Sequence, residues 1–187
     1  MIVYPTETVY GLGCRASESN SIERIARIKK ARQDAPFLIL IRDAGQLRKY
    51  ARQIPPAAER LAQRFWPGPL TLILPARKDL HPRLIGPSGG VGMRVSSHAW
   101  CQALLEQLDE ALISTSANFT GSPAPRSLME LDQQLGAQAD LVIDGGTLPG
   151  EVSTILDLCS DPPLLRRKGA IKAAQIKSVA GNLARIK

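Results

Sequence analysis

The sequence predicts a single α/β domain in which short strands alternate with amphipathic helices. Short apolar runs that suit buried strands recur between stretches whose apolar residues follow helical spacing. No repeat or linker-like segment divides the 187 residues, so one domain spans 1–187. The composition, 44% hydrophobic and 22% charged, is ordinary for a globular protein and argues against a disordered chain.

The first part of the chain predicts two strands, a helix and a third strand. Ile2–Tyr4 is a short apolar run that ends at Pro5, and β-forming residues resume over Thr8–Leu12. Ser21–Ala31 carries isoleucines at helical spacing, which predicts a helix. Phe37–Ile41 is continuously apolar and short, so we expect a buried strand there.

Two helices, a strand and a long loop follow. Asp43 can cap a helix that reaches Arg52, and a proline pair opens a second helix over Pro55–Phe65. Leu70–Leu74 predicts a strand. Lys78–Gly90 contains several prolines and glycines and predicts a long mobile loop. This loop suits either a lid over a ligand or an ordinary connection.

The central segment predicts a strand over Val91–Val95, a helix over Ala99–Leu108 and a strand over Ala111–Thr115. His98 precedes this helix, where we expect a cap rather than a catalyst. A turn rich in Gly, Pro and Ser occupies Phe119–Ser127, and a helix is expected over Leu128–Leu135.

The last segment predicts three strands and a closing helix. The strands are expected at Leu141–Ile143, Ser153–Leu158 and Leu164–Arg166, and the helix over Ala173–Ala184. The alternation of the two element types along the whole chain is what favours the α/β class.

The charge balance indicates a polyanionic partner. Lys and Arg total 24 against 17 for Asp and Glu, which gives a net charge of +7 and a pI near 9.7. Such a surface suits nucleic acid or a nucleotide, or serves only solubility, and composition does not choose between them.

Cysteine and histidine spacing predicts no metal site. The chain has three cysteines without a C-x-x-C pair, and its two histidines, His81 and His98, are not spaced as metal ligands. Free thiols, the lack of a signal-peptide pattern and apolar runs too short to cross a bilayer predict a cytoplasmic protein without a membrane partner.

Three segments carry residues suited to chemistry. Pro5–Gly13 places hydroxyls and a carboxylate between apolar strands, although a simple polar turn would look alike. Lys29–Arg32 ends a helix, where cations either compensate the helix dipole or clamp phosphate. Ser114–Asn118 follows a predicted strand, the place where open α/β sheets bind ligands.

Together these segments resemble the YrdC-like family of threonylcarbamoyl-AMP synthases, of the bacterial type. Its pattern is P-T-E-T-V-Y-G-L-G, then K-x-R before an apolar strand, then S-x-S-A-N before a glycine, matched here by Pro5–Gly13, Lys30–Arg32 and Ser114–Asn118 with Gly121. Glu7–Tyr10 looks like the synthase version of the first motif rather than that of the related YciO-type branch. Further matches, in order, are Trp66–Thr71, Val91–Val95, Gly145–Thr154 and Leu165–Gly169.

The chain departs from the family pattern at two points. A helix and the start of a strand usually precede the first motif, and that helix is missing before Met1. The proline that usually follows the clamp arginine is also absent after Arg32. We expect the first departure to bear on stability more than on chemistry, and the second to have little consequence because the cationic pair remains.

The resemblance implies a fold, an activity and a set of site residues. The fold is a twisted open mixed sheet with flanking helices and a concave basic cleft. The activity is nucleotidyl transfer: threonine, bicarbonate and ATP form threonylcarbamoyl-AMP and pyrophosphate for transfer RNA modification, with Mg²⁺ arriving on ATP. The implied catalytic residues are Lys30 and Arg32; nucleotide contacts come from Lys30, Arg32, Ser116, Asn118, Ser153 and Arg167, and threonine contacts from Thr6, Arg94 and Ser114.

Two other functions stay open from the sequence. One is a module of the same fold that binds double-stranded or transfer RNA without adenylation, which the basic balance supports and the low aromatic content of 4% opposes. The other is a regulatory or assembly subunit without activity. An enzyme of this pathway is also expected to contact the threonylcarbamoyl transferase machinery transiently.

Overall fold

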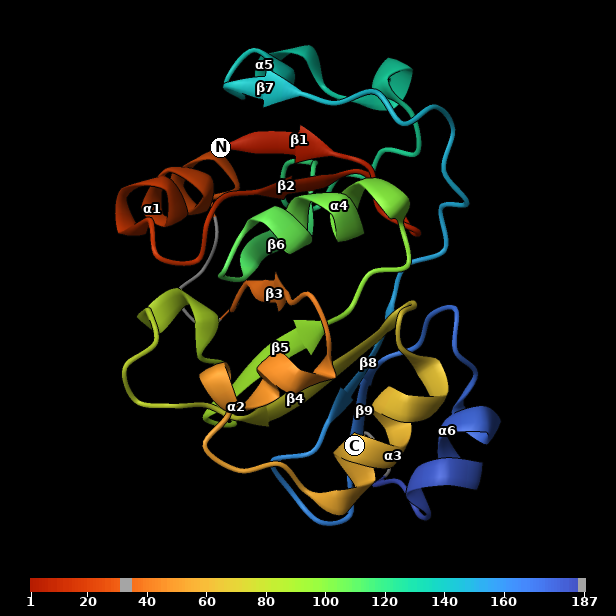
Figure 1. The fold of residues 1–187 in the computed structure, drawn as a ribbon. Coiled ribbons are helices and arrows are strands. Elements are labelled where there is room, and N and C mark those ends of the chain that lie inside the picture. The colour runs from red at the N-terminus through yellow and green to blue at the C-terminus, as the bar shows by residue number, and fades with distance from the viewer. Residues whose placement is uncertain (31–34, 185–187) are drawn as a thin grey trace.

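Nine strands form one sheet within residues 1–30 and 35–184, the part of the chain that the computed structural model describes (Figure 1). The order across the sheet is β7-β1-β2-β6-β3-β5-β4-β8-β9. The strands are β1 (Ile2–Tyr4), β2 (Gly11–Gly13), β3 (Leu38–Leu40), β4 (Leu70–Pro75), β5 (Gly90–Arg94), β6 (Leu112–Ser116), β7 (Leu141–Val142), β8 (Thr154–Asp157) and β9 (Leu164–Arg167).

The sheet is mixed, as expected. β1 pairs with β7, β3 with β5 and β4 with β8 in parallel, and the other neighbours pair antiparallel. The centre of the sheet joins distant parts of the chain, because β6 pairs with β2 on one side and with β3 on the other. A single α/β domain with an open mixed sheet is therefore confirmed.

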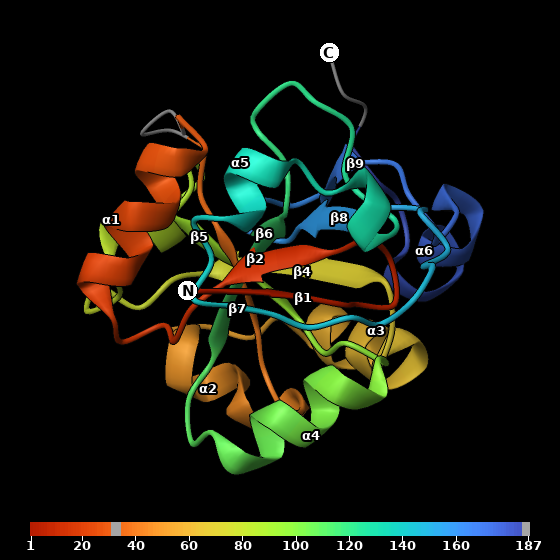
Figure 2. The same ribbon diagram turned by 90° about the horizontal axis from the view of Figure 1, so that it is seen from above.

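Helices cover the sheet on both faces, and α4 and α2 lie on the same side of it in the two views (Figures 1 and 2). On that side Cys101 and Leu105 of α4 pack on Tyr4, Leu40 and Leu112 of three strands. The α-helices are α1 (Ser19–Ile28), α2 (Leu47–Tyr50), α3 (Pro56–Phe65), α4 (Ala99–Gln107), α5 (Gln133–Gly136) and α6 (Ala173–Ala180), with 3-10 turns at Ala44–Gln46, Pro82–Leu84 and Leu128–Glu130.

Local sequence explains where these helices lie. In α1 the isoleucines Ile22, Ile25 and Ile28 are buried on one face, as their spacing predicts. α3 begins at Pro56, where a proline lacks only an N–H that the first turn would leave unpaired. The Asp43 side chain accepts from the Gly45 N–H at 2.8 Å, so the predicted cap forms, although a 3-10 turn precedes the short α2.

Most predicted elements have bounds that differ by a residue or more from those in the structure, and three of the differences have a clear local cause. The second strand begins at Gly11 rather than at Thr8, because the Thr6 side chain closes a turn before it. The helix expected over 128–135 is a 3-10 turn followed by α5, since Asp132 caps a new helix by accepting from the Gln134 and Leu135 N–H groups. The last helix ends before Gly181, whose φ of +82° few other residues adopt.

A further difference concerns the site directly. Ser116, expected after the strand over Ala111–Thr115, lies within β6 together with Ser114, so both side chains belong to the sheet itself. The 78–90 loop is also more structured than expected, because it contains a 3-10 turn with Leu84 buried and the Phe37 N–H donating to the Arg83 carbonyl at 2.8 Å. No helix among the described residues is long and apolar enough to span a bilayer.

Candidate active site

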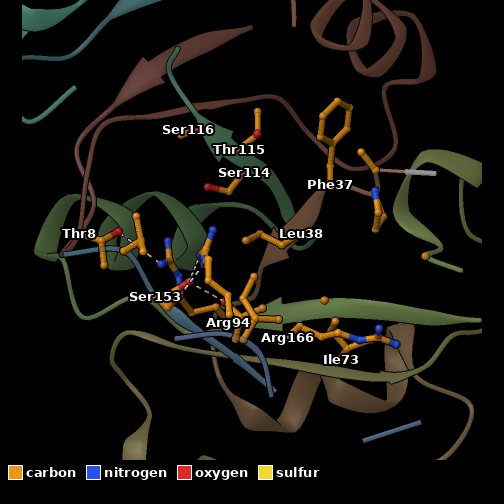
Figure 3. A pocket seen from close by; sticks show the side chains of 18 of the residues that line it. Thr8, Phe37, Leu38, Ile73, Arg94, Ser114, Thr115, Ser116, Ser153 and Arg166 are labelled. Carbon is orange, nitrogen blue, oxygen red and sulfur yellow. Dashed lines mark hydrogen bonds between the residues drawn. The ribbon is translucent and has the colours of Figure 1, made fainter. Parts of the chain in front are cut away.

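A cavity of about 490 Å³ opens over the middle of the sheet (Figure 3). Strands β3, β5, β6, β8 and β9 all contribute to its wall, together with the turn between β1 and β2. We call this cavity the cleft. Its polar and charged lining includes Thr6, Thr8, Thr71, Arg94, Ser114, Thr115, Ser116, Ser153, Asp157, Arg166 and Arg167, and its apolar lining includes Phe37, Leu38, Ile73, Val152 and Ile155.

The turn between β1 and β2 is built around the Thr6 hydroxyl. It donates to the Val9 carbonyl at 2.7 Å, accepts from the Thr8 and Val9 N–H groups, and lies 2.8 Å from the Thr8 hydroxyl. Both threonines are buried. Because these contacts occupy the Thr6 hydroxyl, Thr6 shapes the turn and Thr8 presents the freer oxygen to the cleft.

Arg167 brings a positive charge to the cleft, although the residue as a whole is exposed. Its Nε donates to the Ser153 carbonyl at 2.9 Å and its Nη2 to the Ser153 hydroxyl at 2.8 Å. Burial, and secondarily the nearby Arg94, lowers the pKa of Arg167 from its usual value. Within the described part of the chain no ion pair joins Arg167 to a carboxylate, so an anionic ligand would relieve this cost.

The other two arginines of the cleft face carboxylates. Arg166 pairs with the buried Asp157, whose Oδ2 lies 2.8 Å from Nη2. Arg94, at the end of β5, is only 5% exposed and lies 3.5 Å from the Glu7 carboxylate. Its Nη1 also donates to the Thr8 hydroxyl at 3.4 Å, beside Ser153 in the close-up view (Figure 3).

Lys29 ties the end of α1 to the end of β6. Its Nζ donates to the Ser116 carbonyl at 2.6 Å, the Asn118 carbonyl at 2.8 Å and the Asn118 Oδ1 at 3.0 Å. The Ser116 hydroxyl donates to the same Oδ1 at 2.5 Å. Burial lowers the pKa of Lys29 to about 8. One cation therefore fixes the segment that the sequence indicates as a ligand-binding strand end.

The structure brings together six of the nine residues that the sequence indicates. Thr6, Arg94, Ser114, Ser116, Ser153 and Arg167 all line the cleft. Asn118 lines a different pocket, although its side chain contacts Ser116. Lys30 is exposed, with a φ of +46°, and does not belong to the described lining. Arg32 lies outside the described residues. The roles of all nine remain predictions.

The sequence did not single out Lys29, which contacts the cleft residue Ser116, nor the polar and charged lining residues Thr8, Thr71, Thr115, Asp157 and Arg166. Lys29 belongs to the cationic segment, but the K-x-R spacing indicates Lys30 as the phosphate ligand. The two lysines differ in burial, since Lys29 is buried and Lys30 is exposed. Thr8 was part of the first motif, yet its sequence gives no sign that Thr6 would be occupied by the turn. The His98 side chain accepts from the Trp100 N–H at 3.2 Å, so the expected cap is confirmed.

The described residues include no group of three or more His, Cys, Asp or Glu side chains that could hold a metal ion. The expectation that Mg²⁺ arrives with ATP stays a prediction. The residues that face the cleft instead offer hydroxyls and guanidinium groups, which suit phosphate and carboxylate oxygens.

An open mixed sheet with hydroxyl and guanidinium groups in a cleft over its centre defines this chain as a single α/β domain. More particularly, it belongs to the Sua5/YciO/YrdC family: the family model Sua5_yciO_yrdC, described as "Telomere recombination", matches residues 1–169. The family resemblance that the ordered motifs indicate is thereby confirmed.

Among curated relatives, the threonylcarbamoyl-AMP synthase of Pyrococcus abyssi is 39% identical over 98% of this chain and 54% of its own length. The uncharacterized protein YciO of Escherichia coli is 38% identical over 90% of this chain and 82% of its own. The threonylcarbamoyl-AMP synthase of Idiomarina loihiensis is 36% identical over 79% of this chain and 80% of its own.

Solved structures of the same family are similar to this chain. The crystal structure of P. abyssi Sua5 complexed with L-threonine is 36% identical, with a TM-score of 0.91 over 98% of this chain and 55% of that one. The structure of E. coli YciO is 37% identical, with a TM-score of 0.84 over 94% of this chain and 85% of that one. The chain spans about half the length of the first curated relatives it matches. Identity alone does not separate the synthases from YciO.

Proposed function

We propose that this chain is a threonylcarbamoyl-AMP synthase, which converts L-threonine, bicarbonate and ATP into threonylcarbamoyl-AMP and pyrophosphate. One observation carries the proposal: a single cleft contains Arg94 beside the Thr8 hydroxyl and, with them, Arg167, Ser153 and Ser116. The first pair suits an amino-acid carboxylate, and the second set suits phosphate oxygens. Two of the relatives named above are threonylcarbamoyl-AMP synthases, and one similar structure was solved with L-threonine.

The reaction asks for positioning and charge stabilisation rather than for a protein nucleophile. The threonine amine and bicarbonate form a carbamate with release of water. A carbamate oxygen then attacks the α-phosphorus of ATP, the bond from that phosphorus to the β-phosphate bridge breaks, and pyrophosphate leaves. Cations and hydroxyls held in fixed directions lower the barrier to such a transfer without reorganising during it.

The threonine contacts come from the turn and from β5 and β6. Arg94 pairs with the substrate carboxylate, and Ser114 and the turn closed by Thr6 border the amino acid. Because the Thr6 hydroxyl is occupied, we assign the direct polar contact to Thr8 and a shaping role to Thr6.

The nucleotide contacts come from the other side of the cleft. Ser116, Ser153 and Arg167 bind phosphate or ribose oxygens, and Asn118 supports Ser116. Lys30 and Arg32 grip the triphosphate with its Mg²⁺, which neutralises phosphate charge. Lys29 holds the strand end against which the nucleotide lies.

The 78–90 loop contributes Gly86, Pro87, Ser88 and Gly90 to the cleft. We retain the proposal that it acts as a lid, which excludes water from the hydrolysable mixed anhydride. Hydrogen exchange measured with and without ATP plus threonine tests this; unchanged protection over the loop would remove the lid from the mechanism.

We place the reaction in the cytoplasm, in keeping with three free cysteines at positions 14, 101 and 159. The product serves the transferase that modifies transfer RNA, and a transient contact with that machinery or with RNA is part of the proposal. The basic balance of the chain supports it.

The experiment incubates the protein with ATP, Mg²⁺, bicarbonate and isotopically labelled L-threonine. Mass spectrometry then looks for labelled threonylcarbamoyl-AMP, and a coupled assay follows pyrophosphate. We expect both products, and neither when bicarbonate is removed. A folded protein that binds ATP but makes no labelled adenylate under any condition would contradict the proposal and leave the RNA-binding alternative.

A further inference from the structure

Glu7 is a buried carboxylate that the proposed mechanism does not use. It lies in the turn between β1 and β2, and its side chain is 11% exposed. It does not line the cleft, whereas its neighbour Arg94 does. Glu7 therefore contacts Arg94 without itself lining the cleft.

Ser96 fixes the orientation of this carboxylate. The Ser96 hydroxyl donates to the Glu7 Oε2, and the same hydroxyl accepts from the His98 N–H at 3.2 Å. Ser96 is fully buried. The other carboxylate oxygen, Oε1, faces the Arg94 Nη1 at 3.5 Å.

The Glu7–Arg94 contact is an ion pair without a hydrogen bond. Among the described residues, the Glu7 Oε1 and the Arg94 Nε are two of three buried side-chain atoms with no hydrogen-bond partner. The loose pair offsets the arginine charge while leaving N–H groups for a ligand.

Two other titratable groups near Glu7, Cys101 and Tyr4, are neutral. Burial raises the pKa of Cys101 to about 12, with the Glu7 charge as a smaller cause, and burial also raises the pKa of Tyr4. Before a nucleotide occupies Arg167, whose pKa the nearby Arg94 helps to lower, the charges around Arg94 are the two arginines against Glu7. The net charge of these three side chains is one positive unit, which one negative charge on a ligand would neutralise.

We propose that Glu7 is a specificity-determining residue: its buried charge limits the Arg94 end of the cleft to a single carboxylate and keeps phosphate dianions out. A carboxylate on Arg94 would bring the sum of these charges to zero, whereas a dianion would meet uncompensated repulsion from Glu7. This inference rests on the proposed function, since it takes Arg94 as the site of the substrate carboxylate.

The test measures L-threonine binding by calorimetry, alone and in competition with inorganic phosphate. For Glu7→Gln we expect phosphate to compete roughly tenfold more strongly or better, because one repelling charge is gone. Threonine affinity should change by less than about threefold, because the arginine remains. Glu7→Asp keeps the charge and should keep the discrimination.

Glu110→Gln is the matched control. Glu110 is 18% exposed, pairs with an arginine, Arg15, and accepts from the Ser17 N–H, but it lies outside the cleft lining. Losing this pair should leave phosphate competition unchanged. Equal phosphate competition in wild type and Glu7→Gln, or loss of discrimination in Glu7→Asp, would overturn the inference.

The wild-type chain supplies a measurement that needs no variant. Phosphate should compete less well as the pH rises from about 6 to about 8 and it takes its second charge. Stronger competition by the dianion would contradict a one-charge limit even if Glu7→Gln does not fold. Failure of the proposed function looks different, because a wild-type protein without threonine binding would show no signal to displace.

Discussion

The titration of Lys29 gives a prediction that can be worked through from the structure. Its Nζ serves three acceptors, the Ser116 carbonyl and two oxygens of Asn118, and a protonated amine has the three N–H donors that this requires. A neutral amine has two. Deprotonation should therefore release part of the strand end that borders the nucleotide.

The magnitude follows from the lowered pKa of Lys29, about 8. With this value the charged fraction falls from roughly nine chains in ten at pH 7 to roughly one in ten at pH 9. The rate of pyrophosphate release should fall by a similar factor, close to tenfold. The effect of pH on the free energy of unfolding has the opposite sign. Because the pKa of Lys29 is about 8 in the folded chain and 10.5 in the unfolded one, the unfolded chain binds more protons between these two pH values. The contribution of Lys29 to the stability of the folded state therefore rises as the pH rises from about 8 toward 10.5.

The assay is the initial rate of ATP-dependent pyrophosphate release between about pH 7 and pH 9. The Lys29→Met variant should release pyrophosphate slowly, and its rate should not show the tenfold decline with rising pH. Lys49→Met is the control, since Lys49 pairs with Asp109 on the surface and should leave the wild-type profile intact. A decline of the same size in Lys29→Met, or a wild-type rate that stays level, would refute the reasoning.

Three further predictions concern other parts of the molecule. Arg94→Met should raise the KM for threonine tenfold or more with a smaller change in the KM for ATP, as measured by steady-state kinetics; equal rises would contradict its assignment to the carboxylate. Arg32→Ala should cut pyrophosphate release by roughly 10²-fold, and a rate near wild type would remove Arg32 from the clamp. Gly13→Ala should destabilise the fold by about 2 kcal/mol or more, lowering Tm by about 5 °C or more, because its Cβ would lie 2.0 Å from the Ile113 carbonyl oxygen; an unchanged thermal melt would contradict this.

Much of the fold was predictable because its signals are local. The buried isoleucines of α1 and the proline that opens α3 appear in the sequence at the spacing the helices require. The element bounds that were predicted wrongly depend on side chains that hydrogen-bond to nearby backbone groups. Thr6 closes a turn where strand residues seemed to begin, and Asp132 starts a new helix inside an expected one.

The site was predictable in part, for a related reason. Motif order indicated Ser116, Ser153 and Arg167, and these do meet in one cleft. Lys29 points inward and Lys30 does not, because the end of α1 packs beside the end of β6 and Lys29 bonds to the Ser116 carbonyl there. This is a tertiary contact that no local sequence pattern encodes. Glu7 likewise gains its position only when β5 and the residues after it lie beside the turn.

The strand order has a consequence for how the cleft comes into being. Strand β6 lies between β2 and β3, and β8 borders β4, so the binding surface joins segments that are far apart along the chain. Such high contact order slows folding and leaves no early fragment with the complete surface. A nascent chain that ends before residue 153 would lack Ser153 and Arg167, and so could not yet compete for nucleotide while still on the ribosome.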